Sequence, residues 1–113
     1  MSVVQRFSDL SAARQVLVRL LQSLNFGQIQ DLAIRAGEPI FDPATAVLVD
    51  VKLDVDEGPR PEADLTDFVL QDEVRRLMAR LDGLQNGTIE RIEVRAGIPR
   101  RVIFQRRLTE APR

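Results

Sequence analysis

A chain of 113 residues corresponds to one small domain and leaves little room for a separate catalytic domain. The absence of cysteine and histidine excludes disulfide bonds, thiolate metal sites and the commonest general base near neutral pH. The formal net charge of −1 argues against a globally basic nucleic-acid-binding protein, and no apolar run approaches the roughly 18 residues that cross a bilayer. We therefore expect a cytoplasmic protein that is not an enzyme and has no cofactor and no metal.

The first element that the sequence predicts is a helix that ends at about Ser23. Ser8 or Asp9 can cap its N-terminus, because a short side-chain oxygen accepts hydrogen bonds from the free N–H groups of the first turn. Apolar residues then recur at spacings of three and four, which places them on one stripe of a helix. This stripe contains Leu10, Ala13, Leu17, Leu20, Leu21 and Leu24. The opposite, polar face contains Arg14, Gln15, Arg19 and Gln22.

The segment after this helix occurs twice, as residues 27–39 and 87–99, and we interpret the chain as a duplication of one supersecondary unit. The two segments align without a gap. The matching positions are Gly27, Ile29, Leu32, Ile34, Arg35, Ala36, Gly37 and Pro39 in the first segment, and Gly87, Ile89, Ile92, Val94, Arg95, Ala96, Gly97 and Pro99 in the second. In both, the first two apolar residues are three positions apart, so we expect a β-bulge that returns Ile29 to the buried face.

Each repeated segment also predicts an antiparallel hairpin. The turn Arg35–Gly37 fits a three-residue loop that ends in a left-handed glycine. In that geometry Ile34 pairs with Glu38. The missing N–H of Pro39, and that of Pro99 in the second copy, then points outward, where it blocks the addition of another strand.

The clearest period-two pattern of the chain follows the first hairpin. Apolar positions Val47, Val49, Val51, Leu53 and Val55 alternate with Leu48, Asp50, Lys52 and Asp54. This pattern predicts a strand with one buried face and one solvated face. The corresponding apolar positions of the second copy are Val102, Phe104 and Leu108.

A second helix follows a polar, proline-bearing connector, residues 56–64. Thr66 or Asp67 can cap this helix. Its apolar stripe contains Leu70, Val74, Leu77, Met78 and Leu81, and Leu84 lies just past it.

Together these elements predict an α+β fold of two αββ repeats related by a pseudo-twofold axis. Because the apolar face of one repeat cannot be buried alone, the repeats should form one antiparallel sheet of four or more strands, with two helices on one face. The chain 1–113 is expected to be a single domain, with repeat one at about 8–55, the connector at 56–64 and repeat two at about 65–110. A single-copy ancestor would have been a symmetric dimer. The strand order across the repeats stays open at this point.

The succession of a helix, a Phe-Gly-x-Ile segment and a hairpin with a glycine turn resembles the YezD-like family of very small bacterial proteins. In the first copy the resemblance rests on Leu20, Leu21, Phe26, Gly27, Ile29, Leu32, Ile34 and Gly37. In the second copy, in weaker form, it rests on Leu81, Gly87, Ile89, Ile92, Val94 and Gly97. That family has no assigned activity, so the resemblance implies a bacterial protein and transfers no catalytic or binding residue.

One carboxylate cluster invites a metal-binding interpretation. Its members are Asp50, Asp54, Asp56 and Glu57. The sequence Asp-Val-Asp-Glu-Gly lacks the ligand spacing of a calcium loop, and magnesium sites usually recruit a substrate phosphate as well. A strand with a solvated acidic face predicts the same residues, so whether the stretch Asp50–Glu57 binds a cation stays open here.

The charged residues are unevenly distributed along the chain. Residues 50–73 contain nine acidic and two basic side chains, whereas residues 91–113 contain seven arginines and two glutamates. A basic second hairpin can follow a phosphate backbone. Its arginines are Arg91, Arg95, Arg100, Arg101, Arg106 and Arg107. Arg35 and Arg95 recur at the two turns and could form two anion-binding tips. Shared ancestry, or a charged strand edge that resists aggregation, explains the same residues without nucleic acid.

We therefore expect a non-enzymatic protein-interaction module, a small adaptor or accessory subunit, whose protein partner the sequence does not identify. The candidate partner-binding or anion-binding residues are Arg35, Arg95, Arg100, Arg101, Arg106 and Arg107. The acidic connector is a second candidate surface. The alternative is a nucleic-acid-binding protein that uses the Arg-rich second hairpin. We expect a monomer or homodimer that does not bind a membrane.

Overall fold

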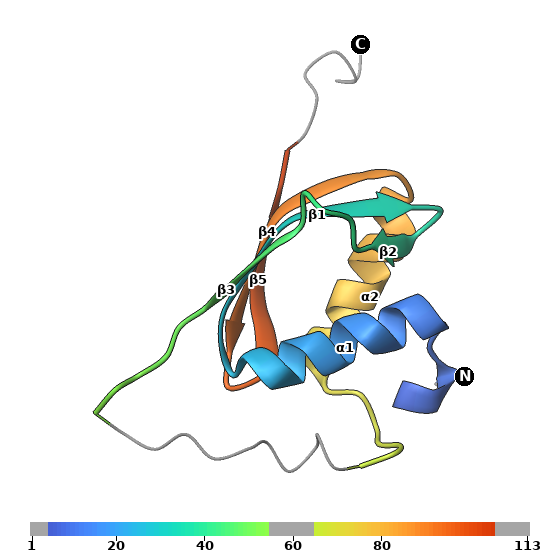
Figure 1. The fold of residues 1–113 in the computed structure, drawn as a ribbon. Coiled ribbons are helices and arrows are strands. Elements are labelled where there is room, and N and C mark those ends of the chain that lie inside the picture. The colour runs from blue at the N-terminus through green and yellow to red at the C-terminus, as the bar shows by residue number, and fades with distance from the viewer. Residues whose placement is uncertain (1–4, 55–64, 106–113) are drawn as a thin grey trace.

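The computed structural model describes residues 5–54 and 65–105 of the chain (Figure 1). They form two helices and an antiparallel sheet of five strands, so the predicted α+β class is confirmed. The helices are α1 (Ala12–Leu24) and α2 (Asp72–Leu84), and a 3₁₀ turn at Phe7–Asp9 precedes α1. The strands are β1 (Phe26–Arg35), β2 (Glu38–Ile40), β3 (Ala46–Val49), β4 (Gly87–Arg95) and β5 (Ile98–Phe104). Neither helix in these two ranges has the length and apolar character needed to cross a membrane.

Two long strands, β1 and β4, pair antiparallel at the centre of the sheet. The strand order is β2-β1-β4-β5, and β3 also pairs with β1. Because β4 occupies one edge of β1, the strands β2 and β3 share the other edge. There β2 pairs with Ala33–Arg35 and β3 pairs with Gly27–Gln30. The sequence left the strand order open. In the structure the two hairpins are joined through their first strands, β1 and β4.

The core lies between one face of the sheet and both helices (Figure 1). Six side chains of β1 and β4 share this face and are at most 3% exposed: Ile29, Leu32, Ile34, Ile89, Ile92 and Val94. They form one cluster with the apolar stripes of α1 and α2. The predicted stripe of the second helix is confirmed, since its five members are buried and Leu84 packs against them.

The predicted β-bulge is confirmed. Ile29 and Leu32 are both fully buried although they are three positions apart. Between them Asp31 has a positive φ of 57°, at the point where the partner of β1 changes from β3 to β2. In β4 the pairing with β5 shifts register between Ile89 and Arg91. Each bulge therefore inserts one extra residue and keeps the apolar side chains of its strand on the helix side.

The hairpin turns are shorter than the sequence analysis predicted. Arg35 pairs with Glu38, and the two residues between them, 36–37, have positive φ values of 50° and 76°. This is the geometry of a type I′ turn, whose twist matches the twist of the paired strands. The predicted pair of Ile34 with Glu38 is therefore wrong. Ile34 pairs with Pro39, which places the proline and not a carboxylate against the core.

The second hairpin repeats this turn. Arg95 pairs with Ile98, and the two residues between them have φ values of 54° and 73°. In each hairpin the pair that contains the proline lies next to the hydrogen-bonded pair that closes the turn, so its backbone groups point away from the partner strand. The missing N–H groups of Pro39 and Pro99 therefore face outward, as predicted, although their partners differ from the predicted ones.

Helix α1 begins later than predicted. Ser11, and not Ser8 or Asp9, is its N-cap residue, and the Ser11 hydroxyl oxygen accepts a hydrogen bond from the backbone N–H of Arg14 at 3.2 Å. The sequence analysis also assigned Gln22 to the polar face, but this side chain is buried. The buried stripe is wider than the leucine spacing alone indicates.

The segment before α2 is tied to the N-terminal segment. Gln71, and not Thr66 or Asp67, is the N-cap residue of α2. The Asp67 carboxylate instead accepts hydrogen bonds from Arg6 Nε at 2.8 Å and from the backbone N–H of Ser8 at 2.9 Å. The Arg6 side chain, followed by the Ser8 N–H, lowers the pKa of Asp67 from its ordinary value of 3.8 to about 2.

Replacement of Asp67 by Asn should make the stability of the fold less dependent on acid pH. A carboxyl group with a lowered pKa stabilises the folded chain above its unfolded pKa of about 3.9 and loses that contribution as the pH falls through the folded value. The free energy of unfolding of Asp67→Asn should therefore lie below that of the wild type at neutral pH, and the difference should shrink between about pH 4 and pH 2. Urea denaturation at a series of pH values measures this difference, and a pH-independent difference would contradict the assignment.

Candidate functional site

Strand β3 and the residues that follow it carry a row of exposed apolar side chains. We call residues 46–54 the β3 arm. The exposed fractions of its larger apolar residues are Val47 39%, Leu48 48%, Val49 59%, Val51 63% and Leu53 95%. In Figure 1 the arm, drawn in green, runs along the edge of the sheet and then away from the helices.

The prediction that one face of this strand is buried is therefore wrong. Val47 pairs with Ile29 and lies on the same side of the sheet, yet Ile29 is fully buried and Val47 is exposed. The reason is the position of the strand, since the helices cover the central strands and also β2, whose Pro39 is fully buried, whereas β3 lies at the edge beyond them (Figure 1). The alternating pattern correctly predicts a strand at Ala46–Val49, but the strand is shorter than predicted, since residues 50–52 have no regular structure and residues 53–54 form a bend. Val55 lies outside the described residues.

The backbone of the β3 arm offers an open row of hydrogen-bonding groups. Among the described residues β3 pairs with β1 alone. The N–H of Asp50 donates to the carbonyl oxygen of Phe26 at 2.8 Å, so Asp50 directs its backbone groups toward β1. In an antiparallel ladder alternate residues point the other way. Val47 and Val49 therefore turn their N–H and C=O groups to the open edge, which is a template for another strand. Val51, beyond the end of β3, is the next position of this series.

Gly27 permits the close approach of β3 to the sheet. A Cβ atom at this position would lie 2.1 Å from the backbone carbonyl oxygen of Leu48, closer than any real side chain comes. At the matching position of the second hairpin, Gly87, the nearest atom belongs to the flexible side chain of Leu84, at 3.3 Å. The first glycine therefore has a role that the second does not share, because only it admits a neighbouring backbone.

A basic groove lies between α2 and β5. Its charged lining residues are Arg76, Arg80, Arg100, Arg101 and Glu73. The half-exposed ring of Phe104 lines it as well. The arginines of β5 were predicted from the sequence but the two on the helix were not, although their spacing of four residues places them on one helix face. An ion pair closes one part of the groove, since Nη1 of Arg100 lies 2.9 Å from Oε2 of Glu73.

The structure does not bring the predicted arginines together into one site. Arg35 and Arg95 are exposed, but Arg35 is the last residue of β1 whereas Arg95 pairs with the first residue, Phe26. At roughly 3.3 Å per residue, the two side chains lie about 30 Å apart at opposite ends of the sheet. Arg106 and Arg107 lie outside the described residues. The two turns are therefore separate surfaces.

The carboxylates considered as metal ligands are likewise not gathered in the part of the chain that the structure describes. Asp50 and Asp54 are exposed on the β3 arm, and Asp56 and Glu57 lie outside the described residues. Within residues 5–54 and 65–105 no group of three or more acidic, histidine or cysteine side chains is placed to hold a metal ion.

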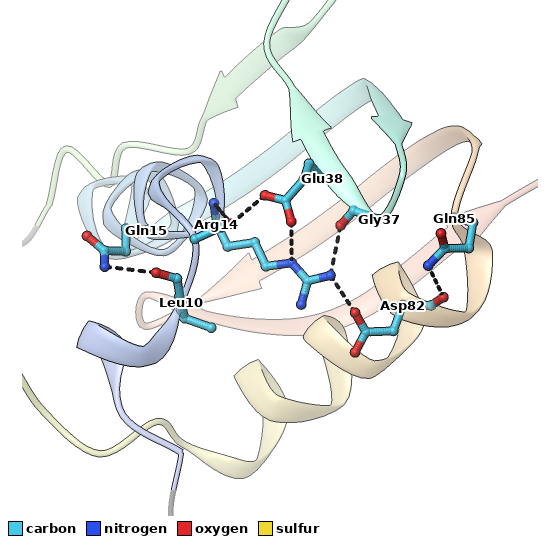
Figure 2. A network of polar contacts seen from close by, with 8 residues as sticks. Leu10, Arg14, Gln15, Gly37, Glu38, Asp82 and Gln85 are labelled. Atoms are coloured by element: carbon cyan, nitrogen blue, oxygen red, sulfur yellow. Dashed lines mark hydrogen bonds and ion pairs between the residues drawn. The ribbon is translucent and has the colours of Figure 1, made fainter.

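Arg14 joins three elements at the turn of the first hairpin (Figure 2). Its Nη2 atom donates to the carbonyl oxygen of Gly37 at 2.9 Å and to Oδ1 of Asp82 on α2 at 2.5 Å. Its Nε atom lies 3.5 Å from Oε2 of Glu38, whose carboxylate also accepts a hydrogen bond from the Ser11 hydroxyl. The Arg14 side chain is only 11% exposed, whereas the side chains of Glu38 and Asp82 are 36% and 66% exposed, so solvent reaches the carboxylates but little of the arginine. The network fixes the hairpin turn between the two helices.

Each hairpin turn also docks on the helix that belongs to the other half of the chain. The N–H of Gly37 donates to the carbonyl oxygen of Gln85 at 2.8 Å, and the N–H of Gly97 donates to that of Asn25 at 2.9 Å. Gln85 and Asn25 are the C-cap residues of α2 and α1. Carbonyl groups at helix ends need such partners. The two halves are thus joined by reciprocal hydrogen bonds as well as by the core.

The chain matches no protein-family model, no curated protein and no solved structure. The resemblance to the YezD-like family therefore stays a prediction. The function has to be inferred from the two surfaces described above, the β3 arm and the basic groove.

Replacement of Arg14 by Leu should destabilise the fold more than replacement of an arginine on the surface of the other helix. The change removes two charge-assisted hydrogen bonds and leaves Glu38 and Asp82 without this cation, which should cost about 2 kcal/mol. The matched control is Arg75→Leu, because Arg75 pairs with Asp72 on the exposed face of α2 and such pairs contribute about 0.5 kcal/mol. Urea denaturation followed by circular dichroism measures both losses. Equal losses would argue against the role assigned to Arg14.

Proposed function

We propose that the protein is a non-enzymatic interaction module, a small adaptor or accessory subunit, that binds another polypeptide along the open edge of the β3 arm. The proposal rests on one observation: the same segment carries exposed apolar side chains and backbone N–H and C=O groups that pair with no other strand among the described residues. Addition of a strand to such an edge satisfies the backbone groups and covers apolar side chains. The lack of cysteine is in keeping with a cytoplasmic location for this activity.

Two features support a functional role for the exposed arm. Natural proteins usually protect sheet edges with charges, prolines or coverings, because open apolar edges promote aggregation. On the neighbouring strand β2, Pro39 provides such protection, whereas Val47, Val49 and Val51 of the arm keep both their N–H groups and their exposed side chains. Gly27 adds a second argument, because a glycine at this position is what lets β3 pair with β1.

We also propose that the chain arose by duplication and that a pseudo-twofold axis passes through the β1–β4 pair. The alignment of residues 27–39 with 87–99 supports this. The reciprocal hydrogen bonds of the two turns, and the matching residues with positive φ, support it as well. In this view the single domain contains two copies of one unit, at about 8–55 and 65–110. The structures of the two copies differ after the hairpin turn. The second copy continues as the single strand β5, whereas the first divides into β2 and β3.

Replacement of Val49 by Pro should abolish binding of the partner without unfolding the domain. The N–H of Val49 points to the open edge, so proline removes a donor to the partner and keeps the bonds between β3 and β1. Val49→Thr is the matched control, because threonine keeps both the N–H and the β-branched shape. Tagged wild type and the Thr variant should recover the same stoichiometric polypeptide from the host lysate, and the Pro variant should recover only a trace.

Circular dichroism and thermal unfolding establish that each variant is folded. The comparison includes an untagged copy of the same chain, co-expressed with the tagged one, as a candidate partner. Equal recovery by the Pro and Thr variants would contradict the proposal. So would a wild type that recovers no polypeptide, itself included.

Nucleic-acid binding is the second candidate function, and the basic groove between α2 and β5 favours it. The four arginines of the groove can follow a phosphate backbone, and the exposed ring of Phe104 offers a face on which a base can stack. The ion pair of Arg100 with Glu73 works against it, because this carboxylate competes with phosphate for the guanidinium group.

Removal of Arg76 and Arg80 tests this second candidate. If the groove binds nucleic acid, Arg76→Ala/Arg80→Ala should bind single-stranded DNA on the order of tenfold more weakly and with a shallower salt dependence, because fewer counterions are released. The control Arg35→Ala/Arg75→Ala removes the same charge from exposed positions outside the groove and should bind as the wild type does. Fluorescence polarisation at two salt concentrations measures both. A wild type without affinity, or equal affinities of the two double variants, would remove this candidate.

A further inference from the structure

We infer that the polypeptide bound along the β3 arm is the β3 arm of a second copy of this chain, antiparallel to the first and related to it by a twofold axis at Val51. The inference rests on the proposed function, because it names the partner of the same open edge. It makes the protein a closed, symmetric dimer in which the two sheets continue into each other.

The register follows from the backbone groups that point outward. Val49 faces the open edge, because the hydrogen bond between Asp50 and Phe26 directs Asp50 toward β1. Strand β3 ends at Val49, and the inference extends the same alternation to Val51. With the axis at Val51, this residue pairs with its own copy across the interface, and Val49 pairs with Leu53 of the second copy. Pairs of this kind exchange N–H···O=C bonds in both directions. The outward groups of both arms are then satisfied together.

Charge complementarity selects this register among its neighbours. With the axis at Val51, Asp50 of each copy lies opposite Lys52 of the other, which gives two reciprocal ion pairs. An axis at Asp50 would set its two carboxylates against each other, and an axis at Lys52 would oppose two ammonium groups and pair Asp50 with Asp54. An axis at Val49 would set Asp50 against an apolar side chain. An axis at Leu53 would also set Lys52 against Asp54, but the backbone bends at residues 53–54, so the extended part of the arm ends there. Among the registers compared, the axis at Val51 is therefore the one that gives ion pairs within the extended residues, which favours a second copy as the partner.

The two faces of the new strand pair also match by chemistry. The valines of the arm lie on the side of the sheet that carries Ile29 and the helices, because Val47 pairs with Ile29, whereas Leu48 lies on the other side. These side chains of the two copies contact each other across the new pair of strands. Lys52 lies on the other side, with its Nζ atom 4.7 Å from the centre of the Phe26 ring. Phe26 belongs to β1, so in the single chain this ammonium group is directed toward its own sheet. Directly opposite residues have Cβ atoms about 5 Å apart, so a change of the Lys52 rotamer brings the ammonium group to the Asp50 carboxylate of the second copy.

Exchange of the charges at positions 50 and 52 tests the inference on the purified full chain. Sedimentation equilibrium should find a concentration-dependent monomer–dimer equilibrium for the wild type. Asp50→Lys and Lys52→Asp each replace two ion pairs by two like-charge contacts and should raise the dimer dissociation constant on the order of tenfold or more. The double variant Asp50→Lys/Lys52→Asp restores both ion pairs with reversed polarity and should return the constant to within about threefold of the wild type.

Asp54→Lys is the matched control. It changes the net charge as Asp50→Lys does, but in this register it lies opposite Leu48, so the dissociation constant should stay near the wild-type value. A wild type that stays monomeric up to about millimolar concentration would overturn the inference. A double variant as weak as the single variants would overturn it too.

The same measurements separate the inference from the proposed function. A monomeric wild type that still recovers a different polypeptide, lost in Val49→Pro and kept in Val49→Thr, would overturn self-pairing and support the proposed function. A monomeric wild type with no such polypeptide would overturn both.

Discussion

The antiparallel pairing of β1 with β4 is the contact on which the other elements depend. Each strand contributes three aliphatic side chains to one face, and the pairing places all six together under both helices. Full burial of such a side chain contributes about 1.5–3 kcal/mol relative to exposure. A single half would leave much of this surface in water. The turns then fix the halves, since each donates a backbone hydrogen bond to the helix end of the other half.

The sequence predicts those parts of the fold that local patterns determine. The bulges are predictable because the same irregular spacing occurs twice in the chain. The turn length is not, because it requires Ala36 at a φ of 50°, a conformation that costs an alanine about 1–2 kcal/mol. Contacts from the other half offset this cost, since the Ala36 N–H donates to Oδ1 of Asn86 at 3.1 Å. The sequence of the turn alone does not predict this contact, because Ala36 and Asn86 are far apart in the chain.

The candidate site was predictable only in part, for a related reason. Alternation specifies which residues of 47–53 share a side of a strand, but whether a helix covers that side depends on where the strand joins the sheet. Val47 and Ile29 belong to similar patterns and differ in burial because β1 is central and β3 is not. The distribution of charged residues along the chain likewise does not predict which of them are neighbours in the folded protein. It groups Arg95 with Arg100, whereas the folded chain groups Arg100 with Arg76 of the helix.

If the two halves arose by the proposed duplication, they now fix their hairpins by different chemistry, and this difference bears on the β3 arm. Arg14, Glu38 and Asp82 of the network in Figure 2 align with Val74, Ile98 and Gln22, which line an apolar hollow in the other half. The charged network thus holds the hairpin whose return strand leads into β3, through a short turn at residues 42–45. An arm that leaves a fixed point loses less conformational freedom when it pairs with another strand. The buried arginine therefore stabilises the fold, and in the proposed function it would also orient the open edge for binding.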